Sequence, residues 1–254
     1  MTTIEEVKEK LKIFEDPNFI FNETLHKYTF NDIELTGGTT FLKKFVKPFD
    51  EDFWAEKKAK SLGITKEEML KQWEETRNKG TELGSKVHKY IEDFYNGLDP
   101  ELPDENDVKS RCEKFHQIYN KKLNKLTFIS AENKIFYEKY NLAGMVDMLY
   151  FYKGEVIMGD WKTNKKISTD KDYCYNNLLN VFSDEKENEL NKYSIQLSIY
   201  KYILKKVANI DVSYCFICHI PEDGDAVLYT CKDYTDRLEK YFNLLDNTTT
   251  NLFI

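Results

Sequence analysis

The amino-acid sequence predicts an α/β fold in which helices flank a mostly antiparallel sheet. Two observations predict it. The first half of the chain is heavily charged, with apolar residues at helical spacing, whereas from residue 127 aromatic and β-branched runs typical of strands take over. The composition agrees with a folded chain, because 41% of the 254 residues are hydrophobic and 15% are aromatic.

The expected elements follow one another without a linker or an internal repeat. Helices are expected over 1–14, within 41–98, and over 108–123, 192–207 and 234–245. Strands are expected over 26–30, 33–35, 127–137, 142–152, 155–163, 212–220 and 226–231, with a polar surface loop over 164–190. We expect one domain over 1–254, made of a helical lead-in with a small hairpin (1–79), a core (80–232), and a C-terminal helix and tail (233–254).

The charge and the cysteines set limits on location and partners. The net charge of −7 disfavours a protein that coats nucleic acid without specificity, but it leaves room for a local basic groove. Only Arg77, Arg111 and Arg237 are arginines, so contacts to DNA would be mostly lysine to phosphate. With no apolar run long enough for a membrane span and no secretory signal, the sequence predicts a cytoplasmic protein with reduced cysteines and no membrane partner.

A predicted hairpin carries the most informative residues. If the chain turns at Lys153-Gly154, the register places Asp147 directly opposite Asp160 on one face of the sheet, and Lys162 projects from that same face. Two facing carboxylates repel, so a divalent cation or the Lys162 ammonium must offset the repulsion. Oxygen ligands in this arrangement suit Mg²⁺ or Mn²⁺. The alternative is a solvated sheet edge with a simple Lys–Asp pair.

A second group of residues recurs every four positions on a predicted helix. Gly80, Gly84, His88 and Glu92 share one face, and glycines in a helix are best tolerated where the backbone approaches a neighbour closely. His88 is therefore a candidate metal ligand, with Glu92 orienting its ring. The alternative is a partly buried histidine that is hydrogen-bonded to Glu92.

A third pair lies on the helix expected over 192–207. Gln196 and Tyr200 are four residues apart and share one face. They are candidates for hydrogen bonds to a phosphate or to an attacking water. The alternative is a helix with two ordinary polar positions.

In this order, a His helix, Gly144-x-x-Asp147, Asp160-Trp-Lys162-Thr and Gln196-x-x-x-Tyr200 resemble the PD-(D/E)XK nuclease superfamily. The resemblance is closest to the RecB-like exonuclease branch, which includes CRISPR-associated, phage and mitochondrial single-strand exonucleases. The motifs span about 80–205, and the segment 41–73 resembles the helical lead-in of phage members. The implied fold is a restriction-endonuclease-like mixed β-sheet flanked by helices, with the site at one sheet edge.

The resemblance also implies roles for individual residues. His88, Asp147, Asp160 and the main-chain carbonyl of Trp161 would hold Mg²⁺ or Mn²⁺, while Lys162 would position or deprotonate the attacking water. Gln196 and Tyr200 would orient the substrate, and Glu132 would support the metal ligands from behind. Beyond the resemblance, Lys165, Lys166 and Lys171 are candidates to guide the phosphate backbone, and Tyr173 and Tyr175 to stack unpaired bases. Lys43, Lys44 and Lys47 are more simply a solvated charged face.

The implied function is a metal-dependent deoxyribonuclease, an exonuclease that leaves 5′-phosphate products in recombination, repair or replication. Its partners would be single-stranded DNA or duplex ends and a helicase or recombination protein, inside the bacterial host cell if a phage encodes it. Two alternatives stay open: a non-catalytic nucleic-acid-binding module on the same fold, and a hydrolase of another phosphate ester.

Two further cofactors are not expected. Cys215-Phe-Ile-Cys218-His219 has the spelling of a haem-attachment motif, but it falls on a predicted strand that sends the two thiols to opposite faces. An iron–sulfur cluster is not expected either, because the positions of Cys112 and Cys231 depart from the pattern of cluster-bearing nucleases.

Overall fold

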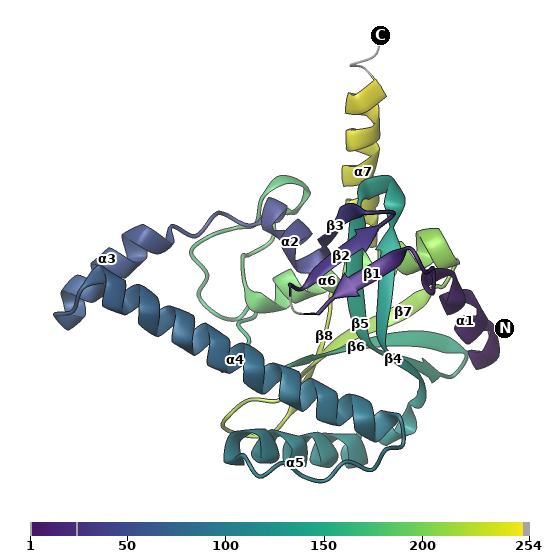
Figure 1. The fold of residues 1–254 in the computed structure, drawn as a ribbon. Coiled ribbons are helices and arrows are strands. Elements are labelled where there is room, and N and C mark those ends of the chain that lie inside the picture. The colour runs from purple at the N-terminus through teal and green to yellow at the C-terminus, as the bar shows by residue number, and fades with distance from the viewer. Residues whose placement is uncertain (1, 24, 251–254) are drawn as a thin grey trace.

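The computed structural model describes residues 2–23 and 25–250, and it has a mixed sheet between two layers of helices (Figure 1). This confirms the predicted fold class. The helices are α1 (Ile4–Leu11), α2 (Gly38–Leu42), α3 (Glu51–Leu62), α4 (Lys66–Tyr95), α5 (Asn106–Lys121), α6 (Glu189–Ala208) and α7 (Thr235–Thr250). The strands are β1 (Phe19–Asn22), β2 (Lys27–Phe30), β3 (Ile33–Gly37), β4 (Thr127–Tyr137), β5 (Leu142–Tyr152), β6 (Glu155–Lys162), β7 (Val212–His219) and β8 (Val227–Thr230).

The sheet runs in the order β1-β2-β3-β5-β6-β7-β8, and β4 pairs with β5 in addition. The pairs β3–β5 and β6–β7 are parallel and the others are antiparallel. Strand β1 was not predicted, because a run of only four residues without alternation gives little periodic signal. It is held by cross-strand aromatic contacts, such as the stacked rings of Phe21 and Tyr28.

Two apolar clusters lie on the two faces of the sheet. Side chains of α6 and α7 pack on one face, and side chains of α5 and the C-terminal half of α4 pack on the other. Strand β5 is buried along almost its whole length, as expected for a strand covered on both faces. Cys215 packs with the first cluster and Cys218 belongs to the second, so the two thiols do lie on opposite faces. Within the described residues, no helix combines the length and the apolar character needed to cross a bilayer.

Helix α3 and the first half of α4 form an arm that projects from the rest of the molecule (Figure 1). Its buried residues, Ala55, Ala59 and Met69, make a small cluster separate from the two on the sheet. Residues 74–82 of α4 are exposed all round and join this arm to the sheet. The helical region expected within 41–98 is interrupted before α3 and again at Gly63, which ends α3 in the left-handed conformation.

The edges of β5 determine where a cavity can form. Strand β4 pairs with one edge from Leu142 to Phe151, except at Asp147. On the other edge, β3 pairs only with Leu142 and Ala143, and β6 pairs only from Met148 to Tyr152. In the described sheet, residues 144–147 therefore face no strand on this edge. The gap between β3 and β6 is the notch into which the side chains described below project.

Candidate active site

The hairpin β5–β6 has the predicted register. Lys153 and Gly154 both have positive φ, at 51° and 88°, as a two-residue hairpin turn requires. The pairs run from Tyr152↔Glu155 to Met148↔Gly159. Asp147 and Asp160 extend the same register just beyond the last pair, where the Asp147 carboxylate accepts the main-chain N–H of Trp161 at 2.9 Å. Both acids line one cavity.

Lys162, which is partly buried, forms an ion pair with one of the two acids, whose carboxylate is buried. Its Nζ lies 2.5 Å from Oδ2 of Asp160, as their shared face predicts. Burial and the neighbouring Asp147 raise the pKa of Asp160 to about 6, although Lys162 acts to lower it. Burial works to lower the pKa of Lys162, but Asp160 and Asp147 outweigh it and hold this pKa above its usual value. The ammonium therefore stays charged beside the carboxylate.

Helix α4 brings His88 to the notch. Its Nδ1 lies 3.5 Å from Oδ2 of Asp147, and its Nε2 lies 3.0 Å from the main-chain oxygen of Trp161. Gly84 allows this approach, because a Cβ there would lie 3.3 Å from Oγ1 of Thr163 at the end of β6. Gly80 faces open space and does not line the cavity. Glu92 lines the cavity, but it pairs with Lys89 at 3.2 Å rather than with His88.

Glu132 lies among the candidate ligands rather than behind them. The pairs on either side of it place it opposite Asp147, and its backbone has a left-handed φ of 49° that interrupts the β4–β5 ladder. One ligand atom each from Glu132, His88 and Asp147 lie within 4.8 Å of one another. Burial, followed by Asp147 and other nearby carboxylates, raises the pKa of Glu132 to about 8. Its strained backbone leaves no signal in the sequence.

Gln196 and Tyr200 come from α6 and are both buried. Gln196 Nε2 donates a hydrogen bond to the Tyr200 hydroxyl oxygen at 3.0 Å. The Tyr200 ring lies against two glycine backbones, since a Cβ on Gly38 or on Gly144 would come within 2.5 or 2.3 Å of the ring. Both polar groups reach the cavity, so the structure brings this pair to the two acids.

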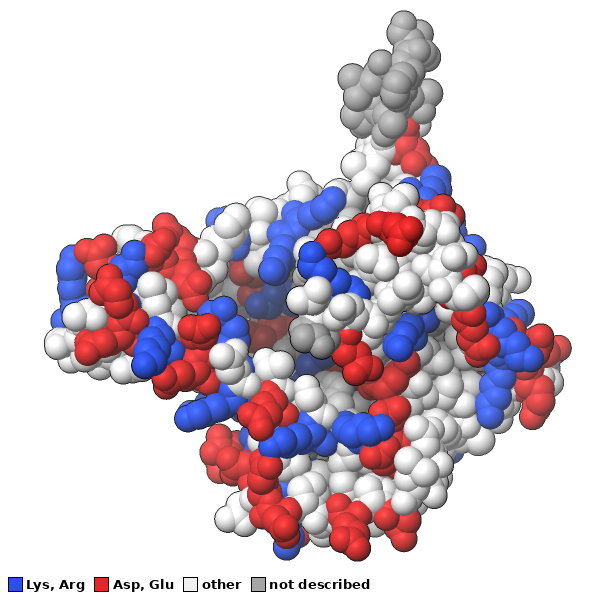
Figure 2. Space-filling model, viewed as in Figure 1, with Lys and Arg blue, Asp and Glu red and all other residues white. Residues whose placement is uncertain are grey.

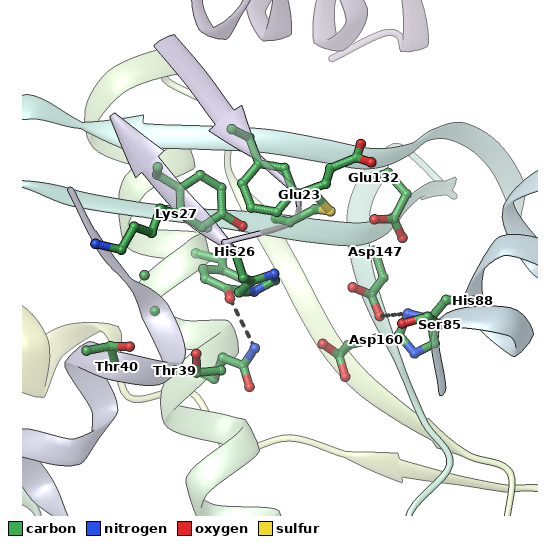
Figure 3. Close-up of a pocket in the computed structure, with 18 of the residues that line it drawn as sticks. Glu23, His26, Lys27, Thr39, Thr40, Ser85, His88, Glu132, Asp147 and Asp160 are labelled. Carbon is green, nitrogen blue, oxygen red and sulfur yellow. Dashed lines mark hydrogen bonds and ion pairs between the residues drawn. The ribbon is translucent and has the colours of Figure 1, made fainter. Parts of the chain in front are cut away.

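The cavity has a volume of about 640 Å³ and lies between α4 and the β1–β3 sheet extension (Figure 3). His88, Glu132, Asp147 and Asp160 gather on one side of it. Sequence reasoning missed the remaining polar residues of the lining, which come from the N-terminal strands and α2 and from one turn of α4; they are Glu23, His26, Lys27, Glu34, Thr36, Thr39, Thr40, Ser85 and Lys89. Only the small hairpin and the Thr–Gly–Gly–Thr–Thr run marked this region, and neither indicated contact with the acids.

The charge of the lining favours a bound cation. Six carboxylates line the cavity against three lysines, and each lysine is paired: Lys27 with Glu34, Lys89 with Glu92, and Lys162 with Asp160. Glu132 and Asp147, beside His88, have no lysine of their own among the described residues. Carboxylate oxygens with one imidazole suit Mn²⁺ or Mg²⁺. The donor set therefore fits a divalent metal ion.

Two predicted substrate-binding lysines do not line the cavity. Lys165 and Lys166 follow β6 and are exposed, and Lys166 Nζ pairs with Oδ1 of Asp172 at 2.7 Å. Lys171, Tyr173 and Tyr175 are exposed further along the same loop. Figure 2 shows both charges intermixed over the molecule, with a hollow between the arm and the sheet.

Comparison with known proteins adds a distant structural likeness. The sequence matches no known protein-family model and no curated protein. Among solved structures, the chain resembles a "putative exonuclease" from Eubacterium rectale with a TM-score of 0.40 and 12% sequence identity. The matched region covers 67% of this chain and 66% of that one. A likeness this distant does not identify the function of the site.

Proposed function

We propose that this protein is a nuclease that requires Mg²⁺ or Mn²⁺ and hydrolyses phosphodiester bonds of DNA. The observation that carries the proposal is the group of Asp147, Asp160 and Lys162 beside His88 and Glu132 in one cavity. Excess carboxylates attract a divalent cation, and the nearby ammonium suits an anionic substrate. The motif order described from the sequence supports the same proposal.

His88, Asp147 and Asp160, with the Trp161 carbonyl and with Glu132, would hold the metal ion. When bound, such an ion supplies Lewis acidity and lowers the pKa of a bound water. Lys162, fixed by Asp160, positions the attacking water and stabilises negative charge that develops on the phosphate. Gln196 and Tyr200 hold each other in place at the cavity wall and orient the scissile phosphate. The product carries a 5′-phosphate.

Exonuclease action is part of this proposal, and a cavity of about 640 Å³ has room for a nucleotide or two at a chain end. The substrate is then a single strand or the end of a duplex. A role in recombination, repair or replication, with a helicase or recombination protein as partner, is part of this proposal.

The test is cleavage of end-labelled single-stranded DNA by the purified full-length chain with Mn²⁺. Asp160→Asn and Lys162→Gln should each lower the cleavage rate by about 100-fold or more, the size of effect seen when a group that stabilises transition-state charge is lost. Matched controls are Asp211→Asn and Lys205→Gln, which remove the partners of an exposed ion pair at the far end of β7. Both control variants should cleave at the wild-type rate.

Three outcomes would contradict the proposal. No cleavage by the wild type at any Mn²⁺ or Mg²⁺ concentration favours a non-catalytic nucleic-acid-binding module. Hydrolysis of nucleotides but not of polymers favours a hydrolase of another phosphate ester. Near-wild-type rates in Asp160→Asn or Lys162→Gln would show that the assignment of that residue is wrong.

A further inference from the structure

We propose that a basic and aromatic strip outside the cavity binds single-stranded polynucleotide and leads it to the acids. The strip consists of Lys43, Lys44, Lys47, Tyr173 and Tyr175. The inference rests on the proposed function, because it names the form of polynucleotide that the site receives. It is carried by the exposure of the rings, the absence of acidic partners for the lysines, and the continuity of the strip with the cavity.

The two tyrosines are the most exposed large hydrophobic residues of the described part of the chain. Tyr173 is 88% exposed and Tyr175 is 86% exposed, and the two are separated by one residue. The loop that carries them is anchored on both sides: Asp170 accepts hydrogen bonds from Asn188 and Asn191, and the main-chain oxygen of Asn176 accepts one from the N–H of Glu187. An anchored loop that presents two uncovered rings has the form of a stacking platform for unpaired bases.

The lysine segment lies beside this loop. No acidic residue occurs between Glu34 and Asp50. Within 2–23 and 25–250, Lys43, Lys44 and Lys47 form no ion pair with a carboxylate, in contrast to the three lysines of the cavity. Lys47 Nζ lies 3.5 Å from Oδ1 of Asn176, next to Tyr175. Ammonium groups without a carboxylate partner, beside exposed rings, match the combination of phosphate and base that a single strand offers.

The strip continues into the cavity. Thr39 and Thr40, which line the cavity, precede Lys43 by a few residues along α2. On the opposite side, Gly84 and Ser85 line the cavity and follow the exposed span of α4 that leads out to the arm. Figure 2 shows the molecule hollowed between the arm and the sheet, with both basic and acidic side chains around the hollow. A strand on the strip is therefore directed towards Asp147 and Asp160.

The test measures binding separately from cleavage. Fluorescence anisotropy of a labelled oligothymidylate is recorded with the full-length Asp160→Asn chain and Mn²⁺, and then with a duplex of the same length. Adding Tyr173→Ala and Tyr175→Ala together should weaken single-strand binding at least about tenfold, since each stacked base contributes about 5- to 150-fold. Duplex binding should change less than twofold, because paired bases cannot stack on the rings. Tyr214→Ala, an exposed tyrosine at the far end of β7, is the control.

The lysines are tested through salt dependence. A variant with Lys43, Lys44 and Lys47 all changed to Gln should bind with a weaker dependence on salt. The magnitude of the slope of log affinity against log salt concentration should fall by about 2. Lys121, Lys122 and Lys125 have the same spacing at the end of α5, and their triple Gln variant is the matched control. That control should keep the slope of the parent chain.

The proposed role of the strip is contradicted if the tyrosine variant binds the single strand as tightly as the parent does. It is equally contradicted if the strip lysine variant and the control lysine variant reduce the salt slope by the same amount. It is also overturned if the parent chain binds no single strand. The proposed nuclease fails separately, by absence of cleavage in the wild type. Wild-type cleavage with unaltered binding in the strip variants would leave the nuclease standing and remove only the strip.

Discussion

At the scale of single residues, Glu132 is the clearest case of strain placed at a site. A left-handed backbone costs a residue with a side chain about 1 kcal/mol, and such conformations persist where the surrounding fold imposes them. Here the neighbouring pairs of β4 with β5 impose it. The result is a carboxylate held beside His88 and Asp147.

Glu132 should make the metal-free protein less stable as pH rises. Its folded pKa of about 8 lies above the ordinary value of 4.5, so the folded state keeps a proton that the unfolded state has lost. The contribution to stability is complete below about pH 4.5 and is lost as pH rises towards 8. The pKa of Asp160 is raised to about 6, so this group also makes the protein less stable as pH rises, over a lower pH range.

The measurement is thermal unfolding in EDTA at pH 5.5 and pH 8. The wild type should lose melting temperature at pH 8, Glu132→Gln should lose less, and Mn²⁺ should restore the wild type. Glu155→Gln makes the same charge change at the exposed hairpin tip and serves as the control. Equal losses in wild type and Glu132→Gln would contradict the prediction.

At the scale of elements, Tyr200 fixes how α6 packs on the sheet. Its ring occupies the space that side chains at Gly38 and Gly144 would need, so α2, β5 and α6 meet around one tyrosine. Packing against the Tyr200 ring therefore explains why the Gly144-x-x-Asp147 motif begins with glycine. Three residues further along β5, that strand carries the acid of the same motif.

Gly144→Ala should lower the free energy of unfolding by about 1–3 kcal/mol, because the new methyl group overpacks the Tyr200 ring. Gly80→Ala is the matched control: its Cβ meets nothing within 4 Å on an exposed helix, so it should raise stability by about 0.5–1 kcal/mol. Urea unfolding of both variants measures the difference. A neutral Gly144→Ala would show that the ring relaxes without cost.

The β5–β6 register could be predicted because a two-residue turn fixes every pair that follows it, and the observed pairs confirm it. His88, Gln196 and Tyr200 could be proposed because helical spacing places them on single faces. The position of Glu132 and the N-terminal side of the cavity could not be predicted. Both depend on a left-handed residue and on the two β3–β5 pairs at Leu142 and Ala143, and no local pattern encodes either.

At the scale of the whole molecule, the arm and the sheet are two packing units. Residue 80, where the sequence predicts the core to begin, lies inside the exposed span of α4 that joins them. This span of α4 buries no side chains, so no packing contacts link the arm to the sheet through it. Local opening of the arm therefore does not require the sheet to unfold.

Met69→Ala should therefore loosen the arm alone. Removing this buried side chain from a small cluster costs about 2–5 kcal/mol of local stability. Hydrogen exchange should speed up over 51–73 while β5 and β6 keep their protection. Met158→Ala, in the main cluster, is the comparison and should lower protection throughout. Equal loss of protection in β5 and β6 from Met69→Ala would show that arm and sheet unfold together.

The aromatic ring held between two bare backbones has an evolutionary consequence. Positions 38, 144 and 200 belong to three separate segments, yet they compete for one volume. A relative with a larger residue at position 38 or 144 would need a smaller residue at position 200. In an alignment of relatives, the residues at these three positions should therefore change together or not at all.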